Sequence, residues 1–207
     1  MAKSYKRYCA VSHALDLVGE RWSLLVATEL LYGPLRYSDL LGRLGCGTNI
    51  LAARLKELEA NGIVLRRKLP PPAASYVYEL TEYGRGLRPV LHELGHWGAR
   101  SLGPPPWDAE LHTGWLPSAL ECALAPAAAE GRFEFHVGDE VASVVDGIVR
   151  AGSVDEPDVV VETDPRGFYR LVVDREIDGI ELEGDRAALD TLLGNLPGNV
   201  PSAALAV

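Results

Sequence analysis

Hydrophobic and polar positions alternate with the period of α-helices along most of the first hundred residues. Apolar side chains recur every three or four positions across residues 10–31, which predicts two short helices or one kinked helix. A glycine-proline turn then precedes a predicted short strand over residues 35–37. Ser38 is expected to cap the next helix, which runs through Leu44. The first segment is therefore predicted to be mainly helical.

Another helix is predicted directly after the glycine-rich turn Gly45-Cys46-Gly47. The Thr48 hydroxyl can cap its first turn, and Asn61-Gly62 supplies the left-handed residue that ends a helix. An apolar stripe at positions i, i+4 and i+7 is expected to be buried. It comprises Leu51, Leu55 and Leu58. The opposite arc comprises Asn49, Ala52, Ala53, Lys56 and Ala60. The segment is either an ordinary amphipathic surface helix or a helix that presents this outer arc to a partner.

The small and polar side chains of the outer arc suit the major groove of DNA. Short side chains let a helix approach the floor of the groove, while asparagine can pair with adenine and lysine with phosphate. A helix, a tight turn and a second helix form the arrangement that places the second helix in that groove. We therefore interpret residues 48–62 as a recognition helix.

A predicted β-hairpin with a cationic strand follows the recognition helix. Residues 63–69 form a β-rich run, a proline-rich tip spans residues 70–75, and residues 76–80 form the returning strand. A two-stranded wing after a recognition helix completes a winged helix-turn-helix, and its cations can meet phosphates or a minor groove. A solvated charge run is the alternative interpretation. The cations are Arg66, Arg67 and Lys68.

One further helix is predicted from Glu82 to Arg100, with Thr81 as its cap. Its apolar stripe is expected to pack on the first helices, and in a dimer part of the stripe would face a partner. The stripe comprises Leu87, Val90, Leu91, Leu94 and Trp97.

Strand-like and helix-like segments alternate in the second half of the chain, which predicts an α+β domain. Gly103-Pro104-Pro105-Pro106 predicts a stiff linker, since consecutive prolines favour an extended conformation. Strands are predicted over residues 132–137, 140–146, 158–163 and 180–183. Helices are predicted over residues 116–130 with a break near Pro126, from Asp164-Pro165 through Leu171, and after Asp185.

Charge separates the two halves of the chain. Residues 1–100 contain 14 Lys+Arg against 9 Asp+Glu, a net charge of +5, whereas residues 101–207 contain 6 against 20, a net charge of −14. Only the first half is therefore expected to approach a polyanion. The sequence has no apolar run of about 18 residues and no hydrophobic signal-peptide core. We expect a cytoplasmic protein that does not enter a membrane.

The cysteines, histidines and known short motifs of the sequence do not predict an enzyme. Three cysteines lie far apart without a CxxC pair, so disulfides and zinc are not expected. His92 and His96 are four apart on a predicted helix and could share a metal, but we expect a surface or interface role for them. Dinucleotide-binding, P-loop and nucleophile-elbow patterns are not found. We expect no catalytic residue, no metal site and no cofactor.

Several blocks of the first half, taken together, resemble the HxlR family of bacterial winged-helix transcriptional regulators. The blocks are residues 9–11, 15–22, 33–40, 51 with 54–59, 62–64 and 78–84. They cover about residues 5–100 in order and with normal spacing. The resemblance implies a homodimer, built through the N-terminal and last helices, that binds an inverted-repeat operator in double-stranded DNA.

The resemblance raises a question about two side chains. Arg54 matches a position where the family usually keeps arginine, but it lies on the flank of the apolar face, so an internal ion pair and a phosphate contact both stay open. Some members sense oxidants or electrophiles through a cysteine near the N-terminus, the region of Cys9. Lys6 and Arg7 are close in sequence and could lower the pKa of such a thiol, although most lone cysteines are small apolar residues.

The second half resembles the sterol-carrier-protein-like fold over roughly residues 115–197. The matching segments are residues 157–164, Phe168, residues 179–185 and Ala188-Leu189. The resemblance implies an apolar tunnel for a hydrophobic small molecule, whose lining residues stay unassigned.

We therefore predict a winged helix-turn-helix domain over residues 1–102, a proline-rich linker over 103–114 and an α+β sterol-carrier-like domain over 115–207. The predicted function is a dimeric transcriptional regulator, a repressor, that responds to an apolar effector. One alternative is a hydrophobic-ligand carrier that uses the first domain as a dimerisation scaffold, and another is a thiol-based redox regulator acting through Cys9. The predicted DNA-binding residues are Arg36, Thr48, Asn49, Ala52, Ala53, Arg54, Lys56, Arg66, Arg67 and Lys68.

Overall fold

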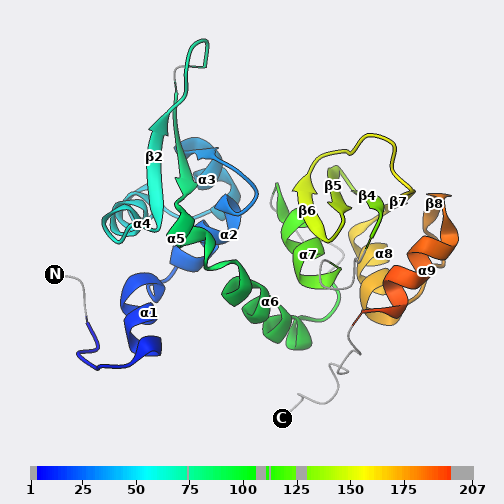
Figure 1. Ribbon diagram of the computed structural model, residues 1–207, viewed down its shortest axis with the longest axis horizontal. Helices are drawn as coiled ribbons and strands as arrows, with labels where there is room; N and C mark the ends of the chain where they lie inside the picture. Colours follow the sequence, from blue (N-terminus) through cyan, green and yellow to red (C-terminus); the bar gives the residue numbers. More distant parts are fainter. Residues whose placement is uncertain (1–3, 74, 106–110, 112, 125–129, 197–207) are drawn as a thin grey trace. The chain divides into compact units, whose positions relative to one another are not determined.

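The computed structural model describes residues 4–73, 75–105, 111, 113–124 and 130–196 of the 207-residue chain. The chain forms two compact units, Met1–Leu91 and His92–Val207, whose elements are labelled in Figure 1. The boundary between the units falls inside helix α6 (Arg88–Leu102). Each unit has its own sheet and is described by itself.

The first unit is a winged helix-turn-helix. Its helices are α1 (Ala10–Val18), α2 (Ser23–Leu30), α3 (Tyr37–Leu44), α4 (Thr48–Ala60), α5 (Glu82–Arg85) and the start of α6. Its strands are β1 (Leu35–Arg36), β2 (Val64–Lys68) and β3 (Tyr76–Leu80), which form an antiparallel sheet in the order β1-β3-β2. The hairpin of β2 and β3 extends from the helices as the wing (Figure 1).

The apolar stripe of α4 explains how this helix is held. Leu51, Leu55 and Leu58 are at most 1% exposed and join the core formed with α2, α3 and the wing. Burial of one such leucine side chain contributes about 1.5–3 kcal/mol, so the stripe fixes which arc of α4 faces outward. The helix ends at Ala60 with Asn61 as its C-cap, and Gly62 follows with φ +69°, which confirms the predicted stop.

Two predicted helix starts were wrong by one or two residues. Helix α3 begins at Tyr37 with Arg36 as its N-cap, and the Asp39 carboxylate accepts the Arg36 backbone N–H at 3.2 Å. Ser38 therefore lies inside the helix and does not cap it. Helix α4 has Gly47 as its N-cap, and Thr48 is its first helical residue without a capping bond from its side chain.

The helix predicted over residues 82–100 is divided into α5 and α6. The Thr81 hydroxyl accepts the Gly84 backbone N–H at 3.0 Å, which confirms Thr81 as the cap. Pro89 follows the break, in the first turn of α6, where its missing N–H costs no helical hydrogen bond. The apolar stripe is divided as well, because Leu91 is buried whereas Trp97 is 70% exposed.

The second unit is an α+β structure with a five-stranded sheet in the order β6-β5-β4-β7-β8. Its strands are β4 (Arg132–Val137), β5 (Glu140–Val145), β6 (Ile148–Ala151), β7 (Val159–Thr163) and β8 (Glu181–Gly184). Strands β4 and β7 are parallel and the other pairs are antiparallel. Its helices are α7 (Trp115–Ala123), α8 (Pro165–Tyr169), the π-helix η1 (Arg170–Asp174) and α9 (Arg186–Gly194).

Helices cover one face of this sheet. Helix α7 packs on β5 and β6, and α8 and α9 pack on β7. Phe135 of β4 meets Phe168 of α8 edge to face at 6.3 Å between ring centres. Glu134 and His136, the alternate residues of β4, lie on the face opposite to Phe135, where Glu134 is only 7% exposed. The predicted helix break near Pro126 and half of the predicted linker, residues 106–110 and 112, lie outside the described residues.

Candidate nucleic-acid interface

The outer arc of α4 is a continuous exposed surface. Asn49, Ala52, Ala53, Lys56 and Ala60 are all exposed, as the position of the buried leucine stripe requires. Thr48, at the start of the helix, is exposed too. Apart from the first-turn residues Thr48 and Asn49, this surface consists of three alanine methyl groups and the Lys56 ammonium group. A second surface can therefore approach the helix backbone closely.

Arg54 turns away from this arc. Its side chain is 15% exposed, and its Nη1 lies 2.6 Å from Glu57 Oε2 and 3.6 Å from Glu20 Oε2. Glu57 is on the same helix, whereas Glu20 follows α1. The structure thus shows the internal ion pair, one of the two interpretations that the sequence left open for Arg54.

Hydrogen bonds fix α4 to its neighbours. Tyr37 at the start of α3 donates its hydroxyl proton to the Thr48 carbonyl at 2.7 Å, which ties the two helices of the motif together at the turn. The Asn61 side-chain amide donates to the Leu17 carbonyl of α1 at 3.1 Å. These positioning contacts were not predicted, because hydrophobic periodicity carries no information about which hydroxyl or amide will reach a distant carbonyl.

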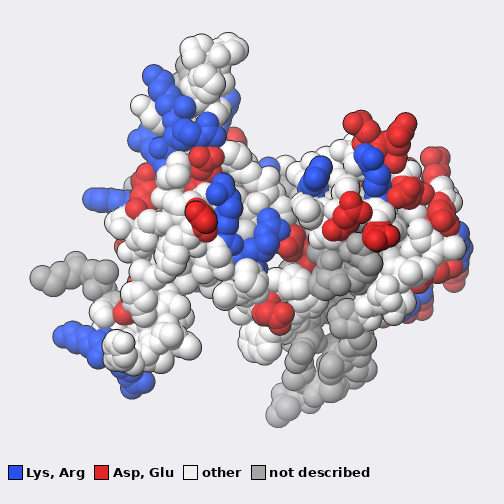
Figure 2. Space-filling view, in the orientation of Figure 1, with Lys and Arg blue, Asp and Glu red and all other residues white. Residues whose placement is uncertain are grey.

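The wing carries a concentration of cations. Figure 2 shows Lys and Arg side chains gathered on the hairpin of the first unit, and Arg66, Arg67 and Lys68 of β2 are all exposed. Arg66 lies over the ring of Tyr76 on β3, with its guanidinium carbon 4.0 Å from the ring centre. Cations on a narrow hairpin create a positive surface that a phosphate backbone can contact.

Arg67 has a different environment from its neighbours on β2. Its Nε and Nη2 donate to the two carboxylate oxygens of Glu79 on β3 at 2.9 and 3.1 Å. The hydrogen bond from Arg67 lowers the pKa of Glu79, and the same bond raises the pKa of Arg67. The pair is therefore charged on both sides across the working pH range.

Arg36 is exposed on β1, opposite Val77 of β3. The predicted DNA-binding residues thus lie on three elements, β1, α4 and β2. The exposed side chains of α4 and β2 form the candidate interface, while Arg54 points into the fold.

Cys9 is exposed at the N-cap of α1. The backbone N–H groups of Ser12 and Val11 in the first turn of α1 lower the pKa of its thiol, since the unpaired N–H groups at a helix start favour a thiolate. The predicted cause was different, because Lys6 and Arg7 are not the source of this shift. Burial raises the pKa of Cys122 instead.

Residues 92–96 of α6 read His-Glu-Leu-Gly-His, which has the His-Glu-x-x-His order of zinc metalloproteases. The two histidine rings meet edge to face at 4.5 Å between centres. Within the described ranges, no group of three or more His, Cys, Asp or Glu side chains is placed to hold a metal. A zinc protease also needs a third ligand, and the described residues place no third metal ligand beside His92 and His96.

Apolar side chains are exposed on two helices that the resemblance assigns to a dimer. They are Val11 and Leu15 on α1 and Val90, Leu94 and Trp97 on α6. Where the structure describes the chain, no helix has the length and apolar character that crossing a bilayer requires.

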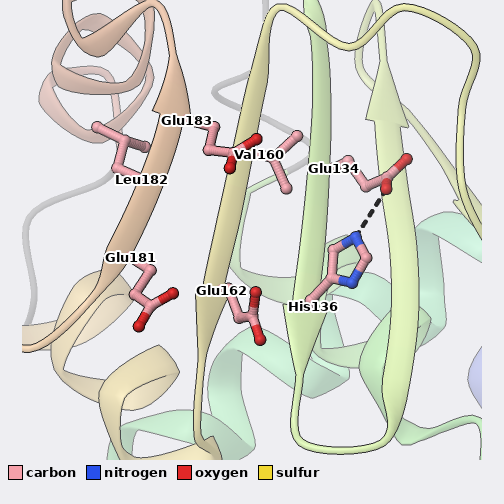
Figure 3. A pocket seen from close by; sticks show the side chains of 7 residues that line it. All are labelled: Glu134, His136, Val160, Glu162, Glu181, Leu182 and Glu183. Carbon is pink, nitrogen blue, oxygen red and sulfur yellow. Dashed lines mark hydrogen bonds and ion pairs between the residues drawn. The ribbon is translucent and has the colours of Figure 1, made fainter.

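A pocket lies on the sheet of the second unit, on the face that carries Glu134 and His136 (Figure 3). Glu134, Glu162, Glu181 and Glu183 line it together with His136, whose Nε2 lies 2.7 Å from Glu134 Oε1. This lining is acidic, whereas the predicted tunnel is apolar. The prediction of an apolar effector therefore rests on the sequence resemblance.

Comparison with known proteins places similarity in the first part of the chain. Residues 17–105 match the family model described as HxlR-like helix-turn-helix. The HTH-type transcriptional regulator sll1512 of Synechocystis is 37% identical over 111 residues, 53% of this chain and 82% of that protein. YodB of Bacillus subtilis, an HTH-type transcriptional regulator, is 37% identical over 92 residues, 44% of this chain and 82% of that protein. The reduced YodB structure has a TM-score of 0.41 at 34% identity and covers 48% of this chain and 100% of that chain.

Proposed function

We propose a function from the premise that this chain belongs to the HxlR-like helix-turn-helix family. The matched relatives sll1512 and YodB are HTH-type transcriptional regulators. We infer that this protein is a sequence-specific DNA-binding regulator that acts as a homodimer on an inverted-repeat operator and represses transcription. The observation that carries the proposal is the exposed, small-residue arc of α4 beside a cationic wing.

Each exposed part has a role in this proposal. Helix α4 enters the major groove, where Asn49 in its first turn accepts and donates hydrogen bonds at the edge of adenine. Ala52 and Ala53 allow the close approach, and Lys56 meets a phosphate. The wing cations contact the neighbouring backbone or minor groove. The net charge of +5 over residues 1–100 favours association with the polyanion.

Exposed apolar side chains on α1 and on α6 support the proposed homodimer. A second copy would bury the exposed side chains of Leu15 on α1 and of Leu94 and Trp97 on α6. A two-fold dimer presents two copies of α4 in opposite orientations, which an inverted repeat matches. The second unit is proposed to respond to an apolar small molecule and thereby to alter DNA binding.

The exposed Cys9 supports a second candidate function, a thiol-based regulator with an inert second unit. Its lowered pKa favours the thiolate, the form that reacts with oxidants and electrophiles. If this candidate is right, Cys9→Ser abolishes the response of DNA binding to oxidant, while Cys122→Ser, at the thiol with a raised pKa, leaves it intact. A normal response of Cys9→Ser would exclude the thiol mechanism.

Selection of DNA from a random-sequence duplex library tests the leading proposal. Full-length protein should enrich a palindromic sequence whose two halves are about one helical turn apart or a multiple of it. If no palindrome is enriched, the carrier alternative with a dimerisation scaffold replaces the regulator.

A further inference from the structure

The three consecutive cations of β2 lie on opposite faces of the wing. Side chains alternate along a strand, and residues directly opposite on paired strands share a face. Arg66 pairs with Tyr78 and Lys68 with Tyr76, whereas Arg67 pairs with Val77. Arg66 and Lys68 therefore share one face with the two tyrosines, and Arg67 lies on the other.

The face that carries Arg66 is the one turned toward the recognition helix. Tyr78 on that face is partly buried, which raises the pKa of its phenol, and the carboxylate of Glu59 on α4 adds to the rise. Arg66 acts on the same phenol in the opposite direction. Strand β2 also packs directly on α4. DNA bound along the outer arc of α4 would therefore meet this face of the wing.

Arg66 stacks on Tyr76 and has no ion-pair partner among the described residues. Its guanidinium stacks on Tyr76, which limits the side-chain freedom that would be lost on binding. Among the described residues, no carboxylate lies within ion-pair distance of Arg66. An exposed arginine without a carboxylate partner is a side chain that a narrow minor groove attracts, because A·T-rich sequence enhances the negative potential there.

Arg67 is committed to the protein. Its Nε and one terminal nitrogen bind both oxygens of Glu79, in the two-pronged geometry that arginine forms with carboxylates. A carboxylate beside the guanidinium also repels phosphate. The pair joins β2 to β3 across the hairpin, on the face of the wing opposite to Arg66.

We propose that Arg66, supported by Tyr76, is the wing residue that reads the DNA flanking the operator, and that Arg67 stabilises the wing through Glu79 without contacting DNA. The inference rests on the proposed DNA-binding function. The DNA feature that Arg66 recognises is a narrow, A·T-rich minor groove on either side of the inverted repeat.

The test compares two duplexes that share the selected palindrome and differ only in A·T-rich or G·C-rich flanks. Full-length protein should bind the A·T-flanked duplex more tightly. Arg66→Ala should lose this preference and weaken binding to the A·T-flanked duplex roughly five- to hundredfold. Arg67→Ala should keep the preference and lower the thermal unfolding temperature, an effect that Glu79→Gln should share.

Tyr76 supplies the second arm of the test. Tyr76→Ala should weaken binding to the A·T-flanked duplex by about two- to fivefold, whereas Tyr76→Phe, which keeps the ring, should bind normally. The loss caused by Tyr76→Ala should vanish in the Arg66→Ala background. Equal flank effects of Arg66→Ala and Arg67→Ala, or additive effects of Arg66→Ala and Tyr76→Ala, would overturn the inference. If wild-type protein selects no DNA, the proposed function fails and this inference fails with it.

Discussion

Arg54 lies on the recognition helix but pairs with Glu57 and with Glu20 after α1. Lys56, two residues further along the same helix, is exposed on the outer arc. The two cations thus differ by the side of α4 from which they project. We infer that Arg54 holds α4 in place, and that Lys56 contributes charge to the DNA contact.

The pair makes a matched experiment. Arg54→Ala should lower the free energy of unfolding by roughly 1–2 kcal/mol, because it removes a mostly buried side chain and leaves its carboxylate partners unpaired. Lys56→Ala should change the free energy of unfolding by less than about 0.5 kcal/mol. It should reduce the slope of log affinity against log salt by about 1, the contribution of one phosphate contact. Urea denaturation and salt-series titrations measure the two effects, and the opposite pattern would contradict these roles.

Helix α4 is the element whose burial decides the orientation of the interface. Its three leucines reach the core, and its alanines and Asn49 remain outside. Loss of the inner stripe should therefore loosen the whole motif rather than a single contact.

Leu55→Ala should destabilise the first unit by about 2–5 kcal/mol, because it removes buried methyl groups and leaves a cavity. Ile50→Ala on the same helix is the control, since Ile50 is 46% exposed and its truncation should cost less than about 1 kcal/mol. Circular dichroism during urea denaturation measures both. Equal losses would mean that α4 is not anchored by this stripe.

The order of elements in the first unit could be predicted because apolar spacing decides which face of a helix is buried. Residues 48–62 are the best example, with the stripe, the outer arc and the Gly62 stop all as expected. The helix starts at Tyr37 and Thr48 were misjudged, because the N-caps are Arg36 and Gly47 rather than the neighbouring hydroxyl residues Ser38 and Thr48. Strand β6 was missed, since it is four residues long and lies at the sheet edge.

The candidate site was predicted less completely than the fold. The cations of β2 were found from their sequence, but their different environments depend on the register of β2 against β3. That register places Glu79 within reach of Arg67 and Tyr76 beneath Arg66. Cross-strand contacts of this kind form between residues ten or more positions apart, so local patterns do not reveal them.

The molecule combines two units with opposite charge. The −14 net charge of residues 101–207 repels a polyanion, so the affinity for DNA must come from the first unit. The proposed operator has two halves and would require two copies of α4, and apolar side chains are exposed on α1 and, separately, on α6.

Trp97→Glu tests the proposed dimer. Trp97 is 70% exposed, so the change should leave the fold intact while placing a charge in the interface. Sedimentation equilibrium should show a shift from dimer to monomer, and operator affinity should fall with it. Glu93→Gln, at another exposed position of α6, should leave the dimer unchanged. A Trp97→Glu protein that remains fully dimeric would place the interface elsewhere.

The most direct test of sequence-specific DNA binding is a fluorescence anisotropy titration of the selected palindrome and a scrambled duplex over about 50–200 mM salt. Full-length protein should bind the palindrome about a thousandfold or more tightly than the scrambled duplex. The logarithm of the association constant should fall linearly with the logarithm of the salt concentration, with a slope of roughly −0.9 for each phosphate contacted. Equal affinity for the two duplexes, or no dependence on salt, would contradict the proposed function.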